Sequence, residues 1–279
     1  MAPNSSPSPN NPLTTIRELI NQPYFDPDSN RPYRGNPLLV DSTLTNAEAR
    51  YEWYFAPEQR FSIAGFYKQI TRPIEAFIAG SDLTTSYANA PEASLYGAEV
   101  ELTKYFDISG LGGEKTWFAN RRIVAVANYT YTRSKLKVAS GDSTTVFGAS
   151  STIATDYFRD GAPLTGQSDH IANLQLGFEN TERLSQQTVL LSYASERVVS
   201  RGLNGSPPQP DVIEKPGLRI DFVAREAVDF LGQEIELKFE ARNITARKHE
   251  EFQQSGTNRI DVNTYDLGRT LTLSAAVNF

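Results

Sequence analysis

The final part of the chain shows the clearest alternation of apolar and polar side chains. In residues 234–243 every second side chain is apolar and the positions between them are charged, so a strand would have one face of each kind. The apolar positions are Ile235, Leu237, Phe239 and Ala241. Residues 270–279 repeat the pattern and end on Phe279. A strand of about ten residues crosses a bilayer core at a tilt of roughly 45°.

Seven earlier segments show the same period of two. They lie around residues 47–55, 61–67, 96–102, 123–131, 172–178, 189–193 and 218–224. Together with the final two, they predict an all-β chain with about nine antiparallel strands.

The connections between these strands alternate in length. Long ones span residues 71–91, 137–168, 196–217 and 244–268, whereas the connections between them are mostly short. This alternation is typical of a transmembrane β-barrel with long outer loops and short periplasmic turns. Residues 107–122 are the exception, because a long connection stands where a short one is expected.

Aromatic residues recur at the ends of the predicted strands. With Phe279 on the periplasmic side, strands running toward the periplasm end at Phe55, Phe106, Phe178, Phe230 and Phe279. Strands running outward carry Tyr67, Tyr131 and Tyr193 near their far ends. Such a two-sided belt indicates a membrane-spanning sheet, since aromatic rings favour both interfaces. The terminal Phe279 resembles the assembly signal that barrel-assembly machinery recognises.

Composition removes several classes of function. A net charge of −6 argues against nucleic acid as a partner. The absence of cysteine excludes disulfides and thiolate metal ligands. The mean hydropathy of −0.42, with no apolar run of 18 residues, excludes transmembrane helices but suits a barrel with a polar lumen. The first ten residues are rich in Pro, Ser and Asn and lack the features of a secretory signal, which predicts a flexible lead-in.

Potential catalytic and metal-binding residues are few. Ser168, Asp169 and His170 are adjacent in sequence, and neighbours on a strand point to opposite faces, which disfavours a catalytic arrangement. His249 lies in a charged loop, and two distant histidines without cysteine have no metal-ligand spacing. We therefore expect no enzyme activity, no metal and no cofactor. The charged residues on the polar strand faces are expected to pair across strands in a wet lumen.

Ligand selection would lie in the long loops, because binding residues concentrate in loops held by a rigid scaffold. The aromatic and polar candidates there are Tyr87, Asn89, Phe147, Tyr157, Phe158, Arg159, Asn204, Phe252, Gln253, Gln254 and Asn258.

The strands and turns resemble the C-terminal part of the barrel of a TonB-dependent outer-membrane receptor. The stretches that carry the resemblance are 51–55, 61–68, 95–101, 128–131, 163–168, 170–178, 238–243 and 265–270. The resemblance covers residues 36–279 and implies a nutrient receptor, for a siderophore or a carbohydrate, in the outer membrane of a Gram-negative bacterium. Residues 1–35 would be a flexible lead-in or part of an outer loop.

The resemblance also implies parts that this sequence does not contain. Complete receptors of this kind have a 22-stranded barrel, an N-terminal plug and a segment that contacts TonB. The chain is therefore expected to be a partial receptor that meets lipid and the assembly machinery directly, and TonB only through the absent region.

Two other interpretations fit parts of the pattern. A soluble β-sandwich for binding or adhesion would show the same alternation and would make Phe279 dispensable. An outer-membrane barrel enzyme would need acid, Ser and His side chains converging at one rim, and the spacing shows no such set.

Overall fold

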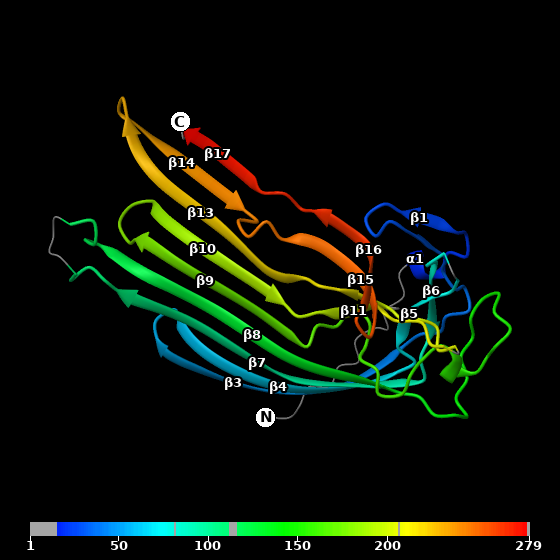
Figure 1. Ribbon diagram of the computed structural model, residues 1–279. Coiled ribbons are helices and arrows are strands. Elements are labelled where there is room, and N and C mark those ends of the chain that lie inside the picture. The colour runs from blue at the N-terminus through cyan, green and yellow to red at the C-terminus, as the bar shows by residue number, and fades with distance from the viewer. Residues whose placement is uncertain (1–15, 81, 112–115, 206, 278–279) are drawn as a thin grey trace.

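A nine-stranded antiparallel sheet is the main element of the fold. The computed structural model describes residues 16–80, 82–111, 116–205 and 207–277. The strands lie in the order β17 (Thr270–Val277), β14 (Gln233–Arg242), β13 (Gly217–Phe230), β10 (Ser185–Ala194), β9 (His170–Asn180), β8 (Arg121–Lys137), β7 (Glu92–Asp107), β4 (Gln59–Thr71) and β3 (Thr43–Ala56). They form a single curved layer of long, tilted strands (Figure 1). The predicted nine strands are thus confirmed.

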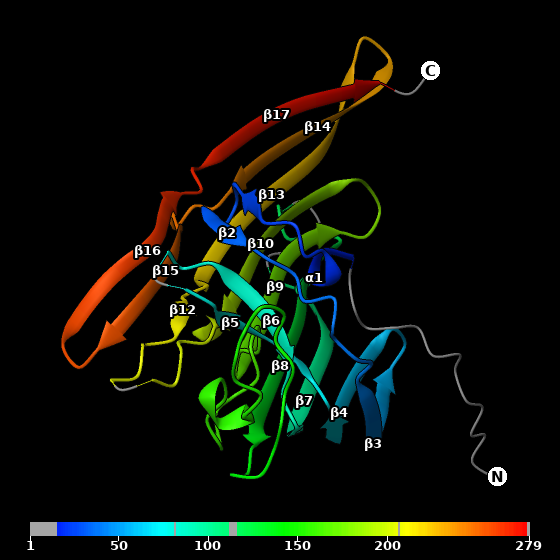
Figure 2. The ribbon, with the colours of Figure 1, turned by 90° about the vertical axis from the view of Figure 1, so that its right-hand side faces the viewer.

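The sheet is open at both edges. Within the described residues, β17 pairs only with β14, and β3 pairs only with β4. The view along the strands shows these two edge strands on opposite sides of the sheet, with the wall curving between them (Figure 2). The chain therefore forms a section of wall and not a closed barrel.

One end of the sheet has mostly short turns. The connection between β13 and β14 is the two-residue turn Leu231-Gly232, with φ of 54° and 81°. Positive φ at both central residues defines the turn type that matches the twist of paired strands. The connection between β7 and β8 is longer, as its sequence predicts.

The long connections at the other end, and the residues before β3, are more ordered than predicted. Their strands are β1 (Tyr24–Asp26), β2 (Arg31–Tyr33), β5 (Ile74–Ile78), β6 (Thr85–Asn89), β11 (Arg197–Ser200), β12 (Val212–Glu214), β15 (Lys248–Ser255) and β16 (Asn258–Asp266). They form two four-stranded sheets, with orders β1-β2-β6-β5 and β11-β12-β15-β16. Short helices occur at α1 (Ile16–Leu19) and η1 (Ala154–Asp156). We call these elements and the segments joining them the loop assembly.

The prediction that these segments are loops or a flexible lead-in was therefore wrong for eight short strands. The strands have three to nine residues, and many of their side chains are polar on both faces, so the period-two signal is weak. Residues 16–35 lie within the loop assembly, since the backbone N–H of Arg34 donates to Thr85.

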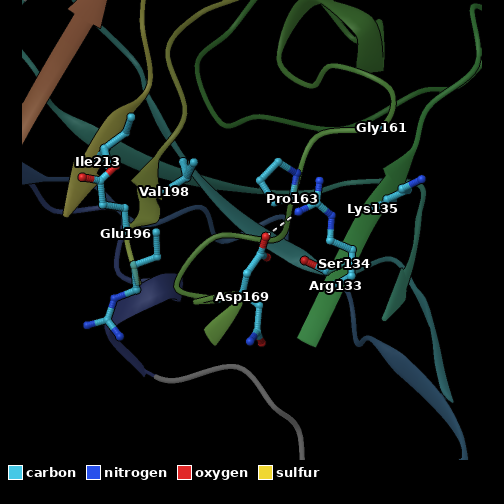
Figure 3. A pocket seen from close by; sticks show the side chains of 11 residues that line it. Arg133, Ser134, Lys135, Gly161, Pro163, Asp169, Glu196, Val198 and Ile213 are labelled. Carbon is cyan, nitrogen blue, oxygen red and sulfur yellow. Dashed lines mark hydrogen bonds and ion pairs between the residues drawn. The ribbon is translucent and has the colours of Figure 1, made fainter. Parts of the chain in front are cut away.

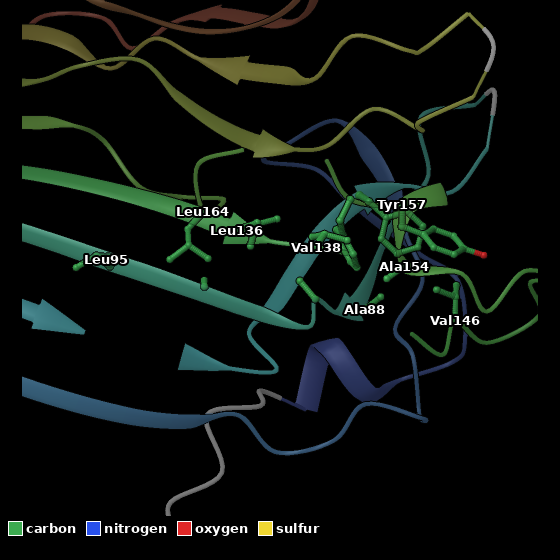
Figure 4. Close-up of a cluster of buried hydrophobic side chains, with 12 residues drawn as sticks. Ala88, Leu95, Leu136, Val138, Val146, Ala154, Tyr157 and Leu164 are labelled. Carbon is green, nitrogen blue, oxygen red and sulfur yellow. The ribbon is translucent and has the colours of Figure 1, made fainter. Parts of the chain in front are cut away.

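A hydrophobic cluster lies where the loop assembly meets the large sheet. Its members include Phe77 of β5 and Phe158 after η1. Figure 4 shows Ala88 of β6 and Leu136 of β8 in the same cluster. Burying one such large side chain contributes roughly 1.5–3 kcal/mol. Three of the four long connections thus share one core with the strands beneath them.

Candidate functional site

The two faces of the large sheet differ in chemistry along whole rows of paired residues. One row, in register across seven strands, is entirely polar: Glu52, Ser62, Glu101, Asn128, Asn173, Ser192 and Arg219. The adjacent row, on the opposite face, is entirely apolar: Trp53, Phe61, Leu102, Ala127, Leu174, Leu191 and Ile220. A sheet with this division can face lipid on one side and water on the other.

The apolar face is uncovered. Leu271 and Leu273 are 72% and 76% exposed, and Trp53 is 56% exposed. A β-sandwich would bury these side chains against a second sheet. Since no second sheet covers them within the described part of the chain, the sandwich alternative does not fit.

Aromatic side chains lie at both ends of the apolar face. Phe106, Phe178 and Phe230 lie near the short turns, while Tyr67, Tyr96 and Tyr193 lie toward the loop assembly, and all are exposed. Tyr96 and Phe106 stand ten residues apart on β7, about 33 Å along the strand. A tilt of 35–45° converts this length to a height of about 25 Å, the thickness of the apolar band of membrane barrels. Phe279 lies outside the described residues.

Charged residues on the polar face form ion pairs, as the sequence predicts. Glu101 contacts Arg60 at 2.9 Å and Arg50 at 3.3 Å, which links β7 to β4 and β3. Arg225 and Glu236 contact each other at 2.7 Å between β13 and β14. These pairs leave the polar face charged and partly exposed, as a water-filled lumen requires.

A buried ion pair joins three of the long connections. Arg201 donates to the Glu75 carboxylate, with its Nε at 2.9 Å from Oε2, and also donates to the carbonyl oxygen of Pro163. The backbone N–H of Thr165 donates to the same carboxylate at 3.2 Å. Both charged side chains are 2% exposed, and burial raises the pKa of Glu75 even though Arg201 and Thr165 act to lower it.

Residues before the first long strand are fixed to the long connections by polar contacts. The fully buried Asn36 donates through Nδ2 to the carbonyl oxygens of Tyr87 and Thr145, at 3.0 and 2.7 Å. Arg31 pairs with Glu251 at 3.1 Å, and burial raises the pKa of Glu251. Sequence reasoning missed Asn36, Arg31 and Arg201, because a buried polar residue in an irregular segment has no periodic signal.

A pocket of about 220 Å³ opens where β8 leaves the sheet and meets β11 and β12. Its wall includes Arg133, Lys135 and Arg197 together with the apolar Val198 and Ile213. Figure 3 shows Arg133 pointing toward Asp169, whereas Lys135 points away from that pair.

A family model described as the TonB-dependent receptor-like β-barrel matches residues 3–278. The chain belongs to this family. A search of curated proteins found no match. Members of the TonB-dependent receptor family are transporters of the outer membrane, which agrees with the two-faced sheet and its aromatic belts. No helix among the described residues is long and apolar enough to cross a membrane.

Three of the sequence-predicted ligand residues are buried in the loop assembly of this TonB-dependent receptor chain. Phe158 is fully buried, Tyr157 is 7% exposed and Phe252 is 4% exposed. Tyr157 packs edge-on against Phe77, and the guanidinium of Arg259 covers the Phe252 ring at 4.0 Å. These rings pack the loop assembly and do not present a surface to a ligand.

Three other predicted ligand residues connect segments of the loop assembly through side-chain amides. Asn89 donates to the carbonyl oxygens of Val40 and Arg72, both at 2.9 Å. Asn204 donates to Thr155, and Gln253 donates to Pro210. These amides satisfy backbone groups and hold the long connections together.

The remaining predicted ligand residues reach the surface. Arg159, Gln254 and Asn258 are exposed, and Tyr87 and Phe147 are half-buried. Arg159 pairs with Asp211 at 2.5 Å, and Arg34 lies over the Phe147 ring at 5.2 Å. The structure does not gather these five side chains into one site.

The Ser168, Asp169 and His170 side chains do not converge. Ser168 donates to the carbonyl oxygen of Ser195, Asp169 pairs with Arg133 at 2.6 Å, and Nδ1 of His170 lies 2.7 Å from the hydroxyl of Tyr129. Each group is engaged with a different partner, which is not the geometry of a nucleophile and its base.

Proposed function

We propose that the chain forms part of the wall and outer surface of a TonB-energised receptor that takes up a nutrient, such as a siderophore complex or a carbohydrate. The rows of paired residues carry the proposal, because one face is polar across seven strands and the next row is apolar across the same strands. The large sheet would line the passage on its polar face and meet lipid on the other. Its open edges would pair with further barrel strands.

The orientation follows from the lengths of the connections. Short turns face the periplasm in bacterial barrels and long connections face the outside. The loop assembly would therefore lie outside the cell, where a nutrient first meets the receptor. Its shared core gives it the rigidity that a selective surface needs.

Selection would use the exposed polar side chains of the loop assembly. Arg159 lies after η1, and Gln254 and Asn258 lie at the tip of the β15–β16 hairpin. A guanidinium recognises the carboxylates or phosphates of a chelate, and amides recognise sugar hydroxyls. The proposal therefore includes both nutrient classes.

Uptake by cells tests the proposal directly. A Gram-negative host producing the receptor would be given a panel of labelled ferric siderophores and labelled oligosaccharides, with and without TonB. We expect uptake of one class, lost when either the receptor or TonB is removed. Uptake that continues at full rate without TonB would contradict the proposal.

The contribution of the loop assembly can be tested in the same cells. Arg159→Ala and Asn258→Ala are expected to weaken binding of the transported class. Asp229→Ala is the matched control, because Asp229 is exposed at the opposite end of the sheet. If all three variants bind the nutrient as the unchanged receptor does, selection does not depend on these two side chains.

A further inference from the structure

The lipid-facing side of the large sheet has one polar row near the short turns. Its members are Arg121 of β8, Asn180 of β9, Ser185 of β10 and Glu226 of β13. Asn180 lies two residues beyond Phe178 on β9, so both share the side that meets lipid. Phe178 belongs to the inner belt, which consists of Phe106, Phe178 and Phe230. On β8 and β9 the polar row therefore lies just beyond that belt, at the level of the periplasmic headgroups.

Arg121 is the buried cation of this row. The residue is 3% exposed, and its guanidinium donates to the hydroxyl of Ser185 at 2.7 Å and to Oε1 of Gln187 at 3.5 Å. Ser185 in turn donates to the carboxylate of Glu226 at 2.6 Å, so a hydroxyl stands between the two charges. Within the described part of the chain, Arg121 forms no ion pair of its own. Because buried charges are paired as a rule, this guanidinium indicates a site for an anion.

The end of the long β7–β8 connection is fixed beside this row. It lies against the β9–β10 turn (Figure 1), where the backbone N–H of Thr181 donates to the carbonyl oxygen of Asn120 at 2.8 Å. The side-chain amide of Asn120 donates to the carboxylate of Glu182 at 2.6 Å. The ring of Trp117 lies 6.0 Å from the ring of Phe178, so Trp117 extends the inner belt. The connection that is longer than its position predicts thus covers the outer side of the wall.

A pocket of about 420 Å³ opens between this connection and the β9–β10 turn. Its wall includes Trp117, Arg121, Asn180, Glu182 and Arg183. The guanidinium of Arg121 lies over the Trp117 ring at 4.1 Å, which fixes its plane at the wall. We call this cavity the inner-rim pocket.

The inner-rim pocket has charges of both signs. The Arg183 side chain is 64% exposed, and its contact with Glu226 is long, at 3.7 Å. Glu182 is also exposed and forms no ion pair in the ranges that the structure describes. Two guanidinium groups suit the oxygens of a phosphate, and a free carboxylate suits an ammonium. The pocket therefore fits a ligand that carries a phosphate and an ammonium close together.

We propose that the inner-rim pocket binds the headgroup of an aminophospholipid of the periplasmic leaflet, of the phosphatidylethanolamine class. The phosphate would reach the guanidinium groups of Arg121 and Arg183, and the ammonium would reach the carboxylate of Glu182. The acyl chains would extend along the apolar face beside Phe178. The inference rests on the membrane placement in the proposed function, and it adds a lipid ligand that is separate from the transported nutrient.

Lipid binding by the purified receptor in detergent, measured by native mass spectrometry, tests this pocket. The probes are phosphatidylethanolamine, phosphatidylglycerol with the same acyl chains, and glycerophosphoethanolamine, the soluble headgroup without chains. We expect phosphatidylethanolamine to bind more tightly than phosphatidylglycerol, because only its headgroup carries the ammonium that Glu182 would recognise. Arg183→Ala should weaken binding of both lipids by up to about fivefold, the upper range for one exposed ion pair.

A variant of Glu182 separates the two charges of the headgroup. Glu182→Gln keeps an acceptor for Asn120 but loses the negative charge, so it should remove the preference for phosphatidylethanolamine over phosphatidylglycerol. Lys104→Ala and Asp229→Asn are the matched controls, since both residues lie at the same end of the sheet and outside the pocket. Both controls should bind the lipids as the unchanged receptor does.

The outcomes separate the possible ligands. Equal affinity of the unchanged receptor for the two lipids would overturn the proposal, as would unchanged lipid binding in Arg183→Ala. Binding of glycerophosphoethanolamine as tight as that of the lipid would overturn it in favour of a soluble ligand. Arg121→Lys keeps the buried charge but loses the planar guanidinium, and it should bind both lipids more weakly. Unchanged binding in that variant would contradict a contact between Arg121 and the phosphate.

Failure of this inference can be distinguished from failure of the proposed function. Nutrient uptake and phospholipid binding are measured separately. No selective lipid binding with intact TonB-dependent uptake sinks only the inner-rim pocket, whereas selective lipid binding without TonB-dependent uptake sinks only the transport proposal.

Discussion

Arg201 and Glu75 are separated by 126 residues in sequence, yet they form an ion pair in which each side chain is only 2% exposed. Glu75 belongs to β5 and Arg201 directly follows β11. Two backbone hydrogen bonds reinforce the contact. The N–H of Ile78 donates to the carbonyl oxygen of Arg201, and the N–H of Arg201 donates to the carbonyl oxygen of Ala76. One charge pair thus fixes the relative position of two long connections.

Removal of one partner of this pair is expected to loosen the loop assembly. Arg201→Met leaves the Glu75 carboxylate buried without its cation, which costs about 3–5 kcal/mol. The double variant Glu75→Leu/Arg201→Met removes both charges and should recover most of that loss. Hydrogen exchange of β5 and β6 in the detergent-solubilised protein measures both effects. Equal loss of protection in the single and double variants would contradict this account.

The raised pKa of Glu75 predicts a specific pH dependence. Because the folded protein holds this proton more tightly than the unfolded chain does, the loop assembly gains stability from Glu75 at low pH. That contribution falls as pH rises from 4.5, the ordinary value, up to the folded pKa, and is constant above it. The slope within this window is at most about 1.4 kcal/mol per pH unit.

Comparison with Glu75→Gln isolates this dependence, since the variant has no carboxyl group to titrate. We subtract the unfolding free energy of the variant from that of the protein with Glu75. This difference should decrease as the pH rises. A difference that increases with pH would show that pairing with Arg201 outweighs burial.

Gly97 is expected to tolerate no side chain. A Cβ there would lie 2.1 Å from the carbonyl oxygen of Tyr131 and 2.6 Å from the Phe66 ring, so the β7–β8 pair would have to separate. Gly97→Ala should cost about 1–3 kcal/mol. Gly65→Ala is the control, because a Cβ at Gly65 meets nothing within 4 Å. Denaturant unfolding of the protein in lipid vesicles measures both, and equal stability of the two variants would refute the prediction.

Leu174 and Gln175 test which face of the sheet meets lipid. They are neighbours on β9, midway between His170 at the outer belt and Phe178 at the inner one. Leu174→Arg would place a charge at the bilayer midplane and should cost about 2–4 kcal/mol, whereas Gln175→Arg points into the lumen and should be nearly neutral. Unfolding in vesicles distinguishes them. A larger loss from Gln175→Arg would reverse the assignment of the faces.

The strands of the wall were predictable because the membrane imposes the same alternation on each of them. Leu174 and Gln175 must point to different solvents, and every neighbouring strand repeats that demand. The predicted strands were nevertheless too short. β7 extends outward to Glu92 and β8 to Lys137, where both faces meet water or the loop assembly and the alternation no longer marks the strand.

The loop assembly was not predictable to the same degree, because its contacts are made between distant segments. Phe158 was interpreted as a ligand residue because it is aromatic and lies in a polar connection, yet it is fully buried against residues from other loops. Asn36 shows the converse, since a loop asparagine of ordinary appearance is the buried junction of two connections. Contacts of this kind depend on the tertiary structure and have no local sequence signal.

The shared core of the long connections also limits how such a receptor can diversify. If one loop were replaced with a relative's loop, a buried residue of the neighbouring loop would lose its partner. Glu75 and Arg201 are such a pair. Substitution at exposed tips, such as Asn258, disturbs no partner in the core. We therefore expect new ligand preferences to arise by point changes at these tips and not by exchange of whole loops.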